Sequence, residues 1–213
     1  MRYSIDKLEL QNFGKIGSVS FDHFSNINLI IGENGTGKTF LLKSLYAAVR
    51  SMEEYQRGDD VRSINEILAE KLRWTFQVEK LGDLVTKGAD DQLVFRAALK
   101  DKELEYHFGQ DCTRKLVNVS GPSAPKAGNS ICIPAKEVLS LFSIILKSRD
   151  IDKSFGFDDT YYDLARALQI SPTLGKNFTV FSESRKIVSN VIDGKVEYGP
   201  WRTPTETVWK TAV

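Results

Sequence analysis

The sequence predicts an α/β fold, and two observations carry that prediction. An apolar run from Ile27 to Ile31 is typical of a buried strand, and a glycine-rich loop and a helical pattern over Phe40–Val49 follow it directly. Strand-like segments before this unit, at 3–21, and after it, at 73–119, are separated by turn residues, as in an antiparallel sheet. We therefore expect a strand, loop and helix unit joined to additional β structure.

Length and composition are those of an ordinary globular protein. The chain has 213 residues, 41% hydrophobic and 27% charged, enough for one large domain or two small ones. A formal net charge of +1 argues against a strongly basic nucleic-acid-binding surface but allows a local patch. Cys112 and Cys132 have no metal-ligand spacing, and we expect reduced thiols in a cytoplasmic protein. No signal peptide and no apolar run of about 18 residues is found, so no membrane span is expected.

The loop between the expected strand and helix fits the phosphate-binding pattern Gly-x4-Gly-Lys-[Ser/Thr]. Its glycines allow backbone conformations closed to residues with a β-carbon, so that successive N–H groups can point into one concavity at a helix N-terminus. Lys38 is expected to reach the β- and γ-phosphates of a nucleotide, and the Thr39 hydroxyl to bind Mg²⁺. A chance match in a turn is the alternative, which the flanking strand and helix disfavour. The loop consists of Gly32, Glu33, Asn34, Gly35, Thr36, Gly37, Lys38 and Thr39.

An antiparallel hairpin is expected immediately before this loop. Apolar residues among polar ones predict one strand over 3–10 and a returning strand over Ile16–Phe21. Gln11 to Lys15 supplies turn chemistry between them, including Asn12, Phe13 and Gly14.

This order of elements resembles the N-terminus of ABC-type ATPases of the RecF, SMC and OLD group. The resemblance is carried by Asn12-Phe13-Gly14, by Asn26 to Thr39 and by Leu41 to Tyr46. It is similar in particular to stand-alone AAA-family ATPases of bacterial defence systems and toxin operons, in which a strand ending like Ile133 to Ser140 also occurs. The similarity covers residues 3–50 and 131–145.

The resemblance implies a P-loop NTPase core of ABC type, with an antiparallel β-subdomain covering the adenine side and a helical segment. It divides the chain into a nucleotide-binding lobe (1–135), a helical segment (136–175) and a tail (176–213). ATP and Mg²⁺ are the implied cofactors. Phe40, which stands where many such loops carry a second hydroxyl, joins the nucleotide-binding residues through its backbone N–H. Further candidate site residues are Asn12, Phe13 and Lys136.

Two motifs of this group are not found in the sequence. The Walker B strand, four apolar residues followed by Asp-Glu, is missing, and neither Asp90-Asp91 nor Asp158-Asp159 follows an apolar strand. The signature motif is also missing, since Val119-Ser120-Gly121 leads into a Pro-rich loop. We therefore assign no catalytic residue and expect the N-terminal half of such an ATPase, with little or no turnover by itself. The implied partners are a second ATPase head, a nuclease or toxin, and DNA.

Two other functions compete with this interpretation. The first is a nucleotide-binding module that does not hydrolyse ATP and acts in regulation or interaction. The second is a P-loop kinase of small substrates, which the leading hairpin and the lack of an Arg-rich lid disfavour.

The rest of the chain predicts further elements from periodicity alone. Arg50–Asp60 is expected to be a solvated polar loop. Short strands are expected at 73–79, 84–87, 92–99, 104–108 and 115–119, and a buried one at 131–133. Helices are expected at 61–72, 136–149 and 160–170.

Overall fold

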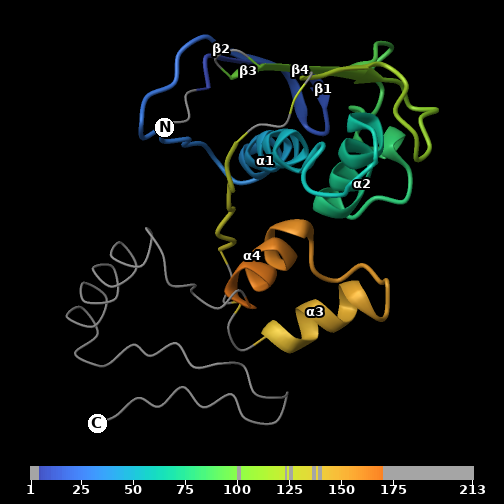
Figure 1. Ribbon diagram of the computed structural model, residues 1–213. Helices are drawn as coiled ribbons and strands as arrows, with labels where there is room; N and C mark the ends of the chain where they lie inside the picture. The colour runs from blue at the N-terminus through green and yellow to red at the C-terminus, as the bar shows by residue number, and fades with distance from the viewer. Residues whose placement is uncertain are drawn as a thin grey trace.

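A five-stranded antiparallel sheet forms one layer of the structure, and helices lie in two further layers on one side of it (Figure 1). The computed structural model describes residues 5–99, 102–122, 124, 127–135, 138 and 141–169. Within these residues no helix is both long and apolar enough to cross a bilayer.

The leading hairpin forms, but its first strand extends beyond residue 10 through Gln11–Phe13, which the sequence predicts in the turn. Strand β1 (Lys7–Phe13) pairs with β2 (Ile16–Phe21), and Phe13 lies opposite Ile16 at the turn. Leu8, Leu10 and Phe13 are all buried, so the in-out alternation of β1 shifts by one residue at Asn12, which has a φ of 52°. This shift directs Phe13, at the end of the strand, into the core.

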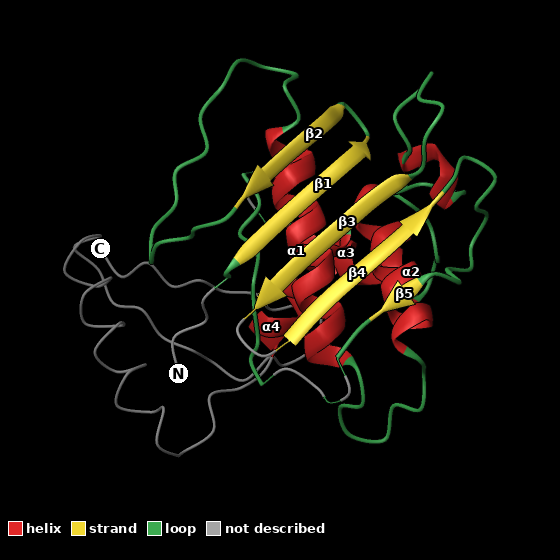
Figure 2. Cartoon of the chain, turned by 90° about the horizontal axis from the view of Figure 1, so that it is seen from above, coloured by secondary structure: helices red, strands yellow, loops and turns green. Residues whose placement is uncertain are grey.

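The hairpin and the later strands belong to a single sheet, in the order β2-β1-β3-β4-β5 (Figure 2). Strands β3 (Leu93–Leu99) and β4 (Lys102–Phe108) occur where the sequence predicts them, and β5 (Val119–Ser120) is shorter than expected. Since β1 pairs with both β2 and β3, it brings the N-terminal hairpin into the β-subdomain.

Two helices cover the inner face of the sheet: α1 (Lys38–Glu54) and α2 (Ile64–Phe76). Both have an apolar face that enters one core with the strands, where Leu10, Phe95 and Tyr106 are fully buried. Helix α2 begins with a capping box in which Ser63 and Glu66 bond each other's backbone N–H groups. A short 3₁₀-helix, η1 (Leu81–Leu84), follows it.

A second pair of helices lies on the side of α1 and α2 that faces away from the sheet (Figure 1). Helices α3 (Phe142–Asp150) and α4 (Asp159–Gln169) share a small core of Val138, Ile145 and Ala165. This apolar core is small, so polar contacts must contribute to holding the pair against the rest of the chain.

The two expected buried strands are wrong. Residues 27–31 and 131–133 have no strand geometry, and Ile27, Leu29 and Ile31 are more than four-fifths exposed (87%, 82% and 84%). The physical reason is that no strand among the described residues pairs with either segment, so nothing supplies backbone partners or covers the side chains.

Several other elements are longer or shorter than the sequence predicts, or of another type. Residues 73–76 continue α2, because Trp74 and Thr75 are buried along the helix, so the strand expected at 73–79 is wrong. The segment 84–87 forms only one bridge, Val85 to Phe13. Helix α1 extends through Glu54 into the expected polar loop, and α3 begins only at Phe142 and leaves Ile144 about half exposed. The expected tail, 176–213, lies outside the described residues.

Candidate functional site

The glycine-rich loop leads directly into the N-terminus of α1. Gly35 and Gly37 have φ angles of 82° and 95°, which residues with a β-carbon rarely adopt. Gly37 is the N-cap of α1 and has no side chain, so no side-chain hydrogen bond closes this end of the helix. The N–H groups of the first turn thus remain available to an external acceptor.

The Lys38 side chain bends back over the loop that precedes it. Its ammonium donates to the carbonyl oxygens of Gly32 (2.7 Å) and Glu33 (2.5 Å). The Thr36 hydroxyl donates to the same Glu33 carbonyl at 3.0 Å. A β-carbon on Gly32 would lie 3.1 Å from Thr36 Oγ1, so the close packing of the loop uses the absence of a side chain there. A positive charge and free N–H groups at one loop can hold an anion.

Thr39 is exposed on the first turn of α1. Its hydroxyl makes no hydrogen bond to any residue that the structure describes, so it is free to bind a ligand. Glu33 and Asn34 are also exposed, on the outer part of the loop.

The turn of the β1–β2 hairpin packs against the loop and the start of α1. Phe40 forms an aromatic cluster with Phe13 and Phe76, with centroid distances of 6.3 Å and 5.0 Å. The Phe40 ring therefore belongs to the core, and only its backbone N–H is left for a nucleotide. The structure brings the hairpin and the loop together, as the order of the motifs suggests.

Of the remaining sequence candidates, Asn12 and Phe13 lie in β1, outside the loop itself. Phe13 is fully buried in the aromatic cluster. The Asn12 side chain donates to the carbonyl of Gln92 at 3.2 Å, which joins β1 to the residue before β3. Lys136 lies outside the described residues.

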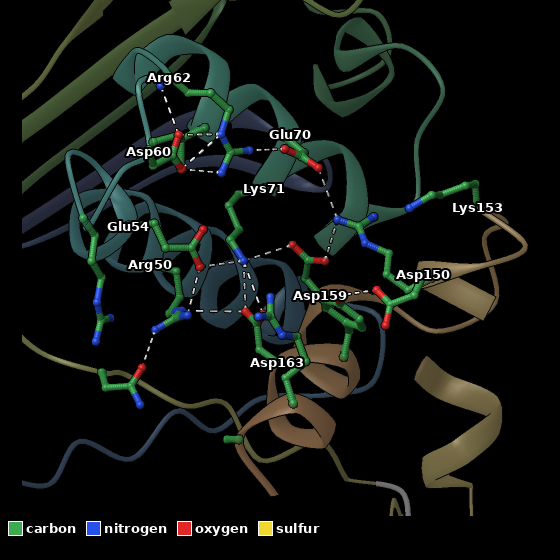
Figure 3. A pocket seen from close by; sticks show the side chains of 17 residues that line it. Arg50, Glu54, Asp60, Arg62, Glu70, Lys71, Asp150, Lys153, Asp159 and Asp163 are labelled. Atoms are coloured by element: carbon green, nitrogen blue, oxygen red, sulfur yellow. Dashed lines mark hydrogen bonds and ion pairs between the residues drawn. The ribbon is translucent and has the colours of Figure 1, made fainter. Parts of the chain in front are cut away.

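A second polar site, which the sequence did not predict, lies between α1, α2 and the α3–α4 pair (Figure 3). It is a cavity of about 660 Å³ lined mainly by charged side chains. We call its innermost members the ionic cluster, which consists of Arg50, Glu54, Lys71, Arg149, Asp159 and Asp163.

Lys71 of α2 is the centre of the ionic cluster. Its ammonium lies 3.0 Å from Glu54 of α1, 3.5 Å from Asp159 and 3.1 Å from Asp163, both of α4. Arg50 of α1 contacts Glu54 at 2.9 Å, and Arg149 of α3 contacts Asp159 at 3.4 Å. The cluster thus joins four helices.

Further contacts link the loop-bearing helix α1 to α4. The Lys43 ammonium lies 2.7 Å from Asp158, and the Tyr46 hydroxyl donates to Asp163 at 2.6 Å. Asp158 and Asp159 stand at the N-terminus of α4, where the helix dipole favours negative charge. Asp158 and Asp159, which do not fit a Walker B motif, therefore connect α4 to α1 and α2 through ion pairs.

Burial and neighbouring charges shift the pKa values of the cluster. Burial raises the pKa of Asp159 to about 6, against the lowering effect of Lys71, and repulsion from Asp163 adds to the increase. Burial alone would lower the pKa of Lys71, but the facing carboxylates Asp159, Asp163 and Glu54 outweigh it and raise that pKa. Lys71 is thus held in its charged form, while Asp159 is protonated more readily than an ordinary aspartate.

Sequence patterns gave only a weak signal for this cluster. Arg50 and Glu53 belong to a charge run that usually indicates a solvated surface, yet their side chains are 11% and 0% exposed. The spacing of Asp159 and Asp163, one helical turn apart at the start of a helix, is consistent with a charged docking face. Nothing in the sequence alone identifies Lys71 as their partner.

Comparison with known proteins adds to this geometry. The profile of a family described as "AAA domain" matches residues 7–115, about half of the chain. The chain belongs to the AAA domain family. The match includes the hairpin, the glycine-rich loop, α1, α2 and β1 to β4, and ends before α3 and α4. Membership in the AAA domain family implies an ATPase-type nucleotide-binding module.

Curated relatives of this AAA domain chain carry the name "DNA replication and repair protein RecF". They come from Francisella tularensis subsp. novicida, subsp. tularensis and subsp. holarctica, and each is 29% identical to this chain over 100 residues. The similarity covers 47% of this chain and 22% of each relative. The chain thus matches about a fifth of the length of these relatives. An ABC-type, SMC-like ATPase N-terminus is consistent with both comparisons.

Proposed function

We propose that this chain binds Mg²⁺-ATP through residues 32–40. The observation that carries the proposal is the Lys38 ammonium held over a loop whose glycines have positive φ, at the uncapped N-terminus of α1. A polyphosphate at this position would accept hydrogen bonds from the backbone N–H groups of the loop and the first helical turn.

Each polar group of the loop has a specific role in this proposal. Lys38 exchanges its carbonyl partners for the β- and γ-phosphates, which are stronger acceptors because they are charged. The Thr39 hydroxyl binds Mg²⁺, whose other ligands are phosphate oxygens and water. The Phe40 N–H contributes a further donor, while its ring anchors the helix in the aromatic cluster.

The wider role that we propose follows from the relatives. RecF is named for DNA replication and repair, and we extend a DNA-related role to this chain, as the ATP-binding part of an SMC-like head. Hydrolysis also needs a group that orients the attacking water. We propose that turnover depends on groups beyond the described loop, including groups from a second head. We also propose a role in defence against phage, from the resemblance to stand-alone AAA-family ATPases of bacterial defence systems, which includes Ile133 to Ser140.

A titration series tests the assignment of the loop. We expect ATP and ADP to bind more tightly than AMP, because the β-phosphate is the group that the loop holds. Thr39→Ala should abolish most of the Mg²⁺ dependence of ATP affinity, and Thr113→Ala, the loss of an exposed hydroxyl outside the loop, should leave it unchanged. Equal affinities for ATP, AMP and adenosine would contradict the proposal.

A further inference from the structure

A second lysine lies over the glycine-rich loop. Lys15 is in the turn between β1 and β2, and its Nζ atom lies 3.8 Å from the position that a β-carbon on Gly35 would occupy. Gly35 has a φ of 82°. Two ammonium groups, from Lys15 and Lys38, therefore approach one loop from different elements.

The neighbours of Lys15 fix the turn in this place. A β-carbon on Gly14 would lie 2.4 Å from the Phe40 ring, so Gly14 packs directly on the start of α1. On the other side of Lys15, Ile16 Cγ1 lies 2.9 Å from the β-carbon position of Gly37. Because three successive residues of the turn contact the loop and the first turn of α1, the backbone of Lys15 is held beside the loop.

The Lys15 ammonium has no partner among the residues that the structure describes. It is exposed and makes neither a hydrogen bond nor an ion pair within that part of the chain. Lys43 and Lys71, by contrast, both face carboxylates at 3.5 Å or less. Lys15 and Lys38 thus bring two positive charges to one loop, near Gly35 and near Gly32 and Glu33, and an anion bound at the loop would be attracted to both.

We propose that Lys15 binds the polyphosphate of the nucleotide as a second cation beside Lys38. This inference rests on the proposed function of the loop. Through Lys15 the bound nucleotide would contact the β1–β2 turn as well as the loop and α1. The hairpin would then take part in ATP binding through a charge, in addition to its packing against Phe40.

The test compares ATP affinities of the full chain carrying Lys15→Met, Lys15→Arg or Lys7→Met. Lys7 is the matched control, because it lies at the other end of β1, about 20 Å along the strand, and its one ion pair among the described residues is with exposed Asp22. We expect Lys15→Met to weaken ATP binding about tenfold, the effect of losing one charge-assisted hydrogen bond. Lys15→Arg should retain most of the affinity. Thermal unfolding should be unchanged in all three variants.

Two readouts separate this inference from the proposed function. We expect the loss in Lys15→Met to be larger for ATP than for AMP and to shrink at high salt, since a partly exposed charge is screened. If Lys15→Met binds ATP as the wild type does while Lys38→Ala does not bind, the inference about Lys15 is wrong and the loop assignment stands. If Lys38→Ala also binds normally, the proposed function itself fails.

Discussion

The ammonium of Lys71 on α2 lies 3.5 Å from a carboxylate oxygen of Asp159 at the start of α4, and their side chains are only 10% and 2% exposed. This pair connects the part of the chain that matches the AAA domain to the helices that follow it. Removing one partner of a buried ion pair leaves an uncompensated charge, which is more costly than losing a surface pair. The docking of α3 and α4 should therefore depend on it.

Lys71→Met tests this dependence. The change leaves Glu54, Asp159 and Asp163 around a cavity without their central cation, and we expect the free energy of unfolding to fall by about 3 kcal/mol. Lys7→Met, which breaks an exposed pair with Asp22, should cost less than about 1 kcal/mol. Urea unfolding measures both. A double-mutant cycle with Asp159→Asn should give a coupling of about 1–3 kcal/mol, and strictly additive effects would contradict direct pairing.

The raised pKa of Asp159 predicts a specific pH dependence. Folded Asp159 has a pKa of about 6, above the ordinary value of 3.8, so the folded state binds this proton more tightly than the unfolded state. Its contribution to stability is therefore greatest at low pH and is lost as pH rises from about 4 to about 6. Asp159→Asn removes the titration, so the variant does not lose this contribution as pH rises. The free energy of unfolding of the variant minus that of the wild type should therefore increase across this window, by roughly 3 kcal/mol at most. Unfolding curves at several pH values measure the difference. A difference that stays constant with pH would exclude this titration.

The close contact of Gly14 with Phe40 predicts a cost for adding one methyl group. Gly14 has a φ of 61°, and a β-carbon there would lie 2.4 Å from the Phe40 ring. Gly14→Ala should lower the free energy of unfolding by about 1–3 kcal/mol, through backbone strain and displacement of the ring. Gly17→Ala is the matched control, because nothing lies within 4 Å of its β-carbon position. Thermal unfolding compares the two, and equal stability of both variants would show that the turn can move away from α1.

The sequence predicts those elements whose pattern is local. Alternation and turn residues locate β1, β2, β3 and β4, and helical spacing locates α1, α2 and α4. The glycine-rich loop is predicted because its residues are contiguous.

Features that depend on distant partners are missed. The apolar run at 27–31 is a strand pattern, but a strand also needs a neighbour, and Leu29 is exposed without one among the described strands. Lys71 and Asp159 are 88 residues apart in the sequence, and only the folded chain brings their charges into contact. The residues around Trp74 have a local pattern typical of a strand. In the structure Trp74 is buried on α2 beside Arg149, whose guanidinium lies 3.3 Å from the ring centroid, and this distant contact favours the helix.

The most direct test of ATP binding is a calorimetric titration of Mg²⁺-ATP into the wild-type chain and into Lys38→Ala. Lys80→Ala serves as the control, because Lys80 is exposed and directly precedes η1, outside the loop. Our account predicts saturable binding of one ATP per chain for the wild type and Lys80→Ala, and a loss of affinity of at least about tenfold for Lys38→Ala. The same ATP affinity in Lys38→Ala and in the wild type would contradict it.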